Sequence, residues 1–209
     1  MMQIVKKPCR SGDCAAWVLS SVFHPVFIPF YTVLIFFTVS HYFFYDTAKI
    51  IRLIFLSAVM VPLLIQLLLY RLNVLRSFFL IRIKARFGFT LLMAFIYYLL
   101  YNTLQPVAVL EYVAVFFRGI IFSLLFSAVF NLFRIKPSLH TMALAGSLFF
   151  LLYWSYDFRT NILDIVSVGI AVTTLVAAAR LKLRAHSLFE LFVGLLIGIS
   201  GQAVSFFLL

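Results

Sequence analysis

Long apolar runs separated by short basic stretches constrain this chain more than any other feature. Of its 209 residues, 65% are hydrophobic and only 11% are charged. Ordinary globular domains carry about 25% charged residues, and a soluble domain of this length cannot cover so much apolar surface because its own surface is large relative to its volume. The sequence therefore predicts an all-α fold, a polytopic bundle of transmembrane helices.

A helix needs about 20 apolar residues to cross the hydrocarbon core, and by that measure the chain has about six to seven spans. The run from Ala15 to Ser40 is longer than the roughly 7–15-residue core of a signal peptide, so we expect it to remain as the first span. Short connections indicate one integral membrane domain over 1–209, with a polar N-terminal segment at 1–15 and a motif-bearing helical core at 134–209. The seven candidate spans are 16–40, 50–70, 87–103, 107–133, 141–157, 162–179 and 187–209.

The formal net charge of +11 is distributed unevenly between the two predicted faces. An excess of Lys and Arg in short loops marks the cytoplasmic side, so we expect a bacterial inner (cytoplasmic) membrane protein with a cytoplasmic N-terminus. A bound anion would collect the same residues and mimic this bias. The apolar and aromatic excess favours membrane lipids over nucleic acid as partners. The basic face carries Lys6, Lys7, Arg10, Arg71, Arg76, Arg82, Lys84, Arg86, Arg134, Lys136, Arg180, Lys182 and Arg184; the other has Lys49, Arg52 and Arg159.

Small residues predict where helices pack most closely. Gly194, Gly198 and Gly201 lie along one side of the last span, and Gly146 lies near the start of the fifth. Such residues let helix backbones approach each other where no hydrophobic force acts between helices. We expect these two spans to pack tightly in the bundle.

Ionisable residues at the edges of spans are costly and therefore candidates for function. Arg180 and His186 lie between the sixth and seventh spans, and Glu190 lies at the start of the seventh. If a helix starts near His186, Glu190 follows on the same helical face. Its carboxylate can accept a proton from one imidazole nitrogen and leave the other free as a nucleophile or base, while the Arg180 guanidinium suits phosphate oxygens.

A second cluster, with Lys136, Ser138 and His140, precedes the fifth span. Ser138 is placed to cap that helix, and the amides of a first helical turn bind anions. Because the fifth and sixth spans form a hairpin, His140 and His186 return to the same face. Two histidines, a carboxylate and several cations, Lys136 among them, can together carry out phosphoryl transfer.

These residues resemble the motifs of the type 2 phosphatidic acid phosphatases (PAP2), relatives of the vanadium haloperoxidases. The family carries K-x6-R-P, P-S-G-H and S-R-x5-H-x3-D. Residues 137–140 are similar to the second motif, and Arg180, His186 and Glu190 match the spacing of the third. The layout also looks like a compact membrane branch of that superfamily, whose first span holds a His-Pro step like the one at His24.

The resemblance implies a metal-independent enzyme with no cofactor, acting on a lipid phosphate or lipid diphosphate. It implies that His186 is the nucleophile that becomes a phosphohistidine and that Glu190 orients it. His140 would be the general acid, and Arg180 and Ser138 would bind the phosphate.

The sequence departs from the family pattern at several positions. Leu139 stands in place of a glycine, Ala179 in place of a serine, and Glu190 in place of an aspartate. The first motif is degenerate, because no Lys stands seven residues before an Arg-Pro; Lys84 and Arg86 are the candidates for its cations.

Two other classes of function remain open. A catalytically degenerate PAP2-like protein would bind lipid phosphate or a membrane partner without turnover. A small transporter would line a central path with His24, Glu111 and Arg118, although the sequence shows no signature of the broken helices at which transporter sites usually form.

Overall fold

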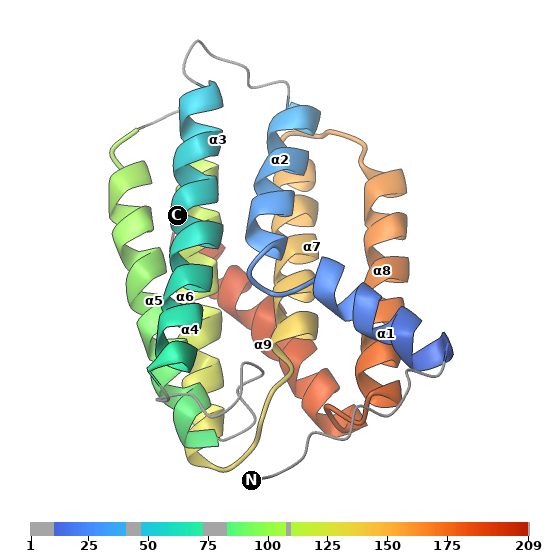
Figure 1. Ribbon diagram of the computed structural model, residues 1–209. Coiled ribbons are helices and arrows are strands. Elements are labelled where there is room, and N and C mark those ends of the chain that lie inside the picture. The colour runs from blue at the N-terminus through green and yellow to red at the C-terminus, as the bar shows by residue number, and fades with distance from the viewer. Residues whose placement is uncertain (1–10, 41–46, 73–82, 108–109, 209) are drawn as a thin grey trace, which may run out of the picture.

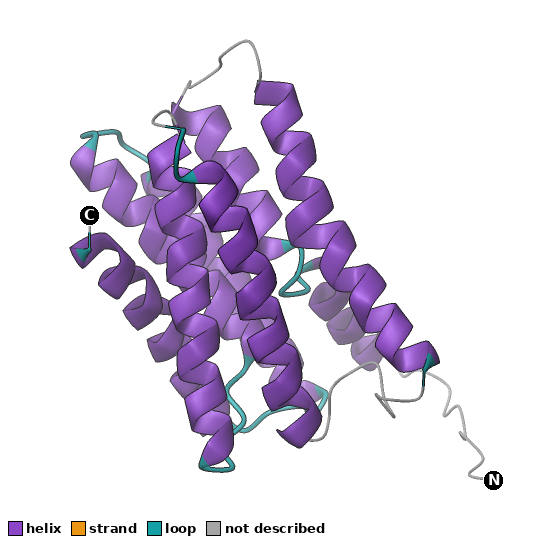
Figure 2. Cartoon of the chain, turned by 90° about the vertical axis from the view of Figure 1, so that its left-hand side faces the viewer, coloured by secondary structure: helices purple, strands orange, loops and turns teal. Residues whose placement is uncertain are grey.

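The structure is a computed structural model that describes residues 11–40, 47–72, 83–107 and 110–208, and within these ranges every regular element is a helix (Figures 1 and 2). The predicted all-α fold class is thereby confirmed. The elements are α1 Ser11–Val22, α2 Ile28–Ser40, α3 Thr47–Phe55, the π-helical segment Leu56–Met60, α4 Val61–Arg71, α5 Ile83–Leu104, α6 Glu111–Leu132, α7 Leu139–Asp157, α8 Leu163–Lys182 and α9 Leu188–Phe207.

Among the described residues, five helical stretches are long and apolar enough to cross a membrane. They are Thr47–Arg71, Arg86–Leu104, Glu111–Leu132, Leu163–Lys182 and Leu188–Phe207. The first of them joins α3, the π-helical segment and α4 into one continuous span. The predicted fifth span corresponds to α7, which runs through the middle of the bundle with much of its surface buried by its neighbours.

The predicted single span at 16–40 is wrong, because the chain breaks between α1 and α2. Pro25 offers no backbone N–H, and its ring disfavours helical geometry at the preceding His24. The chain turns instead, with Phe27 N donating to the His24 carbonyl at 2.8 Å. As a result α1 lies across α8 near the lower end of the bundle, whereas α2 rises beside α7 (Figure 1).

Helices α6, α7 and α9 pack against one another at the centre, and glycines in α9 make this possible. A Cβ added to Gly198 would lie 2.1 Å from the Met142 carbonyl oxygen of α7, and one added to Gly201 would lie 2.7 Å from the Ser123 backbone nitrogen of α6. The predicted close contact of the last span is confirmed. These contacts hold the N-terminal end of α9 against the start of α7, where two of the predicted motifs meet.

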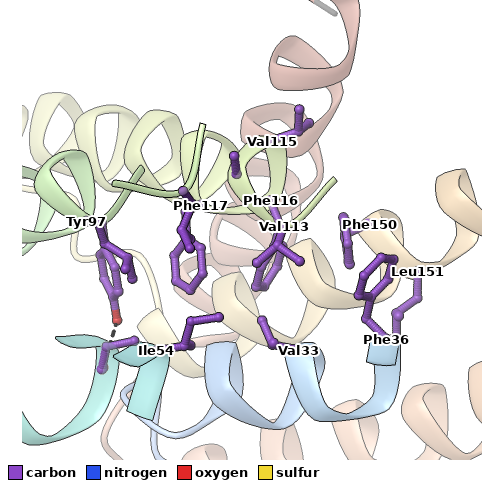
Figure 3. Packing of buried hydrophobic residues seen from close by; sticks show 14 of the residues in the cluster. Val33, Phe36, Ile54, Tyr97, Val113, Val115, Phe116, Phe117, Phe150 and Leu151 are labelled. Carbon is purple, nitrogen blue, oxygen red and sulfur yellow. Dashed lines mark hydrogen bonds between the residues drawn. The ribbon is translucent and has the colours of Figure 1, made fainter. Parts of the chain in front are cut away.

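Aromatic rings fill the space between α2, α6 and α7 (Figure 3). The ring centroids of Phe116 and Phe150 lie 4.6 Å apart, and those of Phe36 and Trp154 lie 5.4 Å apart at a steep angle. Such offset and edge-to-face pairs stabilise a core beyond the area they bury. Phe116 also forms part of the wall of the cavity described next, so this core fixes one side of the site.

Candidate active site

A cavity of about 530 Å³ opens at the end of the bundle where α5 begins, α6 leads to α7 and α8 leads to α9. This is the lower end in Figure 1. Its wall carries three histidines and four cations, and no carboxylate belongs to the described lining residues. The cations are Arg86, Lys136, Arg180 and Arg184, and the histidines are His24, His140 and His186. Four cations in one concave site, with no carboxylate among the described lining residues, favour an anionic ligand.

The turn before α9 fixes the position of His186. Ser187 is the N-cap of α9 and forms a reciprocal capping box with Glu190. The Glu190 carboxylate oxygen that accepts from the Ser187 backbone N–H at 3.1 Å also accepts from His186 Nδ1–H at 3.0 Å. Because Nδ1 carries the proton, the lone pair of His186 lies on Nε2. The helix start thus holds an imidazole with a defined tautomer on the cavity wall.

Burial, and then the positive charge of Arg86, lower the pKa of the His186 imidazole below its ordinary value of 6.5, while the hydrogen bond to Glu190 raises it. The lowering effects win. His186 is therefore neutral near pH 7 and has a lone pair available for attack.

Arg180 lies in the last turn of α8, and the helix end directs the chain back toward the site. Ala185 N donates to the Arg180 carbonyl, and Arg184 N to the Leu181 carbonyl, while Arg184 has φ 50°. This is a Schellman ending with an arginine where glycine is usual. The buried Nε of Arg180 has no hydrogen-bond partner, so its guanidinium retains donor capacity for an anion.

Lys84 and Arg86 were the candidates for the cations of the degenerate first motif. Arg86 lies in the cavity wall. Its Nη2 donates to the Pro137 carbonyl and so joins the start of α5 to the loop before α7. Arg86 is 5% exposed, and its Nε has no partner. The side chain of Lys84 lies outside the described part of the structure.

The loop before α7 and the start of α7 are joined to the start of α9 by one backbone–backbone bond and one side-chain bond. Ser138 N donates to the Glu190 carbonyl oxygen at 3.0 Å, and Thr141 Oγ1 donates to the Leu191 carbonyl oxygen at 3.0 Å. Ser138 is the N-cap residue of α7, as expected, but its hydroxyl makes no capping bond. Its buried Oγ has no partner and lies outside the lining of the cavity, whereas Leu139 is a lining residue.

His140 is held by α1. Its Nε2–H donates to the Ser20 backbone carbonyl at 3.1 Å. A carbonyl can only accept, so Nδ1 is the nitrogen of neutral His140 that is left without a proton. To act as an acid from Nδ1, His140 must first become an imidazolium.

Reasoning from sequence did not include His24 in the phosphate site. Its ring lies edge-on to that of His140, with centroids 5.8 Å apart. The His-Pro step was the available signal, but placing His24 in the cavity required the break between α1 and α2. Three residues were expected to line a transport path, and of these only His24 lines the cavity. Glu111 is exposed, and Arg118 Nη2 donates to the Ser205 carbonyl at 2.7 Å.

The cavity changes character away from the cations. Its remaining wall is mainly apolar and comes from α2, α5, α6 and α7, with Pro29, Phe89, Met93, Phe116 and Ile120 among its residues. A site that is cationic at one end and apolar along its length is complementary to an amphiphile with an anionic head group.

Comparison with known proteins gives one match. The family model described as the PAP2 superfamily matches residues 123–207, which span the second half of α6 and nearly all of α7, α8 and α9. No curated protein and no solved structure matches the chain. The match covers His140, Arg180, His186 and Glu190, while Arg86 and His24 lie outside it.

Proposed function

We propose that this chain, whose residues 123–207 form a PAP2 superfamily domain, is an integral membrane phosphatase acting on a phosphomonoester or diphosphate of a lipid. One observation carries the proposal: His186, oriented by Glu190, lies on the wall of a cavity with four cations, and buried Nε atoms of Arg86 and Arg180 lack partners. Buried donors without partners are rare in folded proteins. Phosphate oxygens would satisfy both guanidinium groups.

In the first step, His186 Nε2 attacks phosphorus. A P–N bond forms as the P–O bond to the lipid breaks, and the product is a phosphohistidine. Glu190 accepts from Nδ1–H throughout and stabilises the positive charge that develops on the imidazole, as the carboxylate does in a Ser-His-Asp triad. Arg180, Arg86 and Lys136 bind the non-bridging oxygens and stabilise their charge in the transition state.

The lipid leaves as an alkoxide, or as a lipid monophosphate when the substrate is a diphosphate, and in either case its leaving oxygen takes up a proton. His140 in its imidazolium form is the proposed donor, through Nδ1. In the second step, a water molecule attacks the phosphohistidine, His140 accepts the water proton, and the P–N bond breaks. Inorganic phosphate is released and neutral His186 is restored.

The substrate class follows from the two-part lining of the cavity. A lipid entering sideways from one leaflet can leave its phosphate among the cations and its chain against the apolar wall. The proposal needs no metal ion or other cofactor, since the cations and the imidazoles supply charge stabilisation and proton transfer. We further propose an inner (cytoplasmic) membrane location with the N-terminus in the cytoplasm, from the basic-residue count.

The proposal is tested with purified protein in detergent or nanodiscs. Phosphate release is measured from phosphatidate, phosphatidylglycerophosphate, a polyprenyl diphosphate and a phosphorylated glycolipid. His186→Ala should abolish release and acid-labile labelling of the protein by substrate phosphate, with lipid phosphate binding retained. Equal rates in the wild type and His186→Ala would end the catalytic proposal.

A non-enzymatic lipid-phosphate binder is the second candidate. Leu139 favours it, because this side chain lies in the cavity wall where the family has a glycine. The binder predicts saturable binding of lipid phosphate without release and partial tolerance of His140→Ala. Leu139→Gly distinguishes the two: a gain in turnover supports a residual enzyme, whereas unchanged binding and no turnover support the binder.

A further inference from the structure

Gln202 is a buried polar side chain in the apolar part of the cavity, and its acceptor is unsatisfied. Gln202 lies in α9, is 1% exposed and forms part of the cavity lining. It is 14 residues beyond Leu188, the first residue of α9, which places it about 21 Å along the helix axis from the end that holds His186. Gln202 is therefore far from the cationic wall and beside the region expected to bind a lipid chain.

The orientation of the Gln202 carboxamide follows from its one hydrogen bond. Nε2 donates to the Phe116 carbonyl oxygen at 3.1 Å. Since that carbonyl cannot donate, the amide nitrogen must face it and the amide oxygen must face elsewhere. This Oε1 is buried and has no partner. Gly119 supplies the space for it, because a Cβ there would lie 2.3 Å from Oε1.

Three other polar side chains of the same wall, those of Thr90, Ser123 and Tyr97, already have partners within the protein. Thr90 Oγ1 donates to the Phe87 carbonyl at 2.9 Å, and Ser123 Oγ donates to the Gly119 carbonyl at 2.9 Å. The Tyr97 hydroxyl donates to the Ala58 carbonyl at 3.3 Å, the dashed line in Figure 3. These groups need no ligand. The Gln202 oxygen differs because it can only accept, and leaving a buried acceptor unpaired destabilises the protein.

We propose that the apolar part of the cavity binds a lipid chain that carries a hydrogen-bond donor, a hydroxyl or an amide N–H, which donates to Gln202 Oε1. The phosphate head group of this ligand is inferred from the proposed phosphate site, so this part of the inference rests on the proposed function. The chain selectivity is separate. A purely hydrocarbon chain would cover Oε1 without bonding it, so the protein should discriminate between lipids of equal length by the presence and position of the donor.

The test uses two series of single-chain amphiphiles of one length, bound to the full chain in detergent. One series has a phosphonate head group, which cannot be hydrolysed, and the other an uncharged head group. Within each series the chain is plain, or carries a hydroxyl or an amide at successive positions. Dissociation constants should show one donor position bound about tenfold more tightly than the plain chain, as expected for satisfying a buried acceptor.

Gln202→Leu should remove this preference and leave the affinity for the plain chain unchanged or improved. Gln202→Met is the second variant if the leucine variant does not fold. Thr90→Val is the matched control, since it removes a polar group that is already bonded, and it should keep the preference. Preference for the hydroxyl or for the amide series identifies which donor is used.

Equal binding of plain and donor-bearing chains by the wild type, or a preference that survives in Gln202→Leu, would overturn the inference. If the wild type binds the phosphonate and uncharged series with equal affinity but keeps the donor preference, the result counts against the proposed phosphatase. The chain selectivity would still stand.

Discussion

Glu190 accepts from His186 Nδ1–H through the carboxylate oxygen that also closes the first turn of α9. The Glu190 side chain therefore orients the proposed nucleophile and also caps α9, whose start positions His186. The separation of four residues brings them together, and Ser187 between them supplies the other half of the capping box. Substitutions of Glu190 should affect both the chemistry and the helix start.

Glu190→Gln should shift the acid limb of the pH profile as well as lower the rate. His186 must be neutral to attack, so kcat/KM falls as the pH drops through its pKa, which burial and Arg86 hold below 6.5. Glu190 raises this pKa, so its loss moves the acid limb to still lower pH. The rate should fall by up to about 10⁴-fold, as when the orienting carboxylate of a triad is replaced. A rate loss with an unmoved acid limb would indicate only a structural role.

Arg86→Leu should reduce kcat/KM by roughly 10²-fold, the usual cost of removing one donor to developing charge. Arg86→Lys retains the charge but lacks the planar fork, so it should be intermediate. The control is Arg52→Leu, which makes the same change in charge at an exposed position in α3. Comparable losses in both leucine variants would remove Arg86 from the phosphate site.

Arg184→Gly and Arg159→Gly form a pair that separates stability from binding. Both residues follow helices with positive φ, 50° and 51°, where glycine avoids the steric cost of a side chain. Each substitution should stabilise the fold by up to about 1 kcal/mol, measured as the midpoint of thermal unfolding in detergent. Arg184→Gly alone should weaken lipid phosphate binding, since Arg184 lines the cavity and Arg159 does not. Equal binding by the two variants would contradict the assignment.

Gly198→Ala should destabilise the bundle by about 1–3 kcal/mol, the range for overpacking. Its Cβ would lie 2.1 Å from the Met142 carbonyl oxygen and 3.0 Å from Gly146 N, both backbone atoms of α7. Gly88→Ala is the matched control, because a Cβ there meets nothing within 4 Å. The expected order of unfolding midpoints is Gly88→Ala at or above the wild type and Gly198→Ala well below it.

A reporter fused after Leu209 tests the proposed sidedness. With a cytoplasmic N-terminus, the seven spans expected from the sequence predict a reporter that is active outside the cytoplasm. Four of the basic residues in the count line the cavity, so their charge serves the site as well as the orientation. Activity of a cytoplasmic reporter at this position would reverse the proposed orientation.

Local spacing explains which parts of the site could be predicted. His186 and Glu190 are four residues apart, so a single helix start determines their contact. The contact between Arg86 and Pro137 spans 51 residues, and no pattern in the sequence indicates it. It depends on how α5 packs beside the loop before α7, which hydropathy does not determine.

The predictions that failed share another cause. The run over 16–40 is apolar throughout, so span length alone predicts one helix, although Pro25 breaks it into α1 and α2. Ser138 has a residue type and position suited to capping, yet its hydroxyl makes no such bond. Both predictions relied on one general preference, apolar length or residue type, that the chain does not follow at that point, and the break at Pro25 also brings His24 into the cavity.

The bond from Ser138 N to the Glu190 carbonyl oxygen involves no side-chain atom. Any L-amino acid except proline at position 138, and any at position 190, can in principle make it. The backbone contact that brings the two motif-bearing segments together is thus encoded separately from the groups that would perform the proposed chemistry. Evolution could alter or discard the activity at these positions while the architecture persisted.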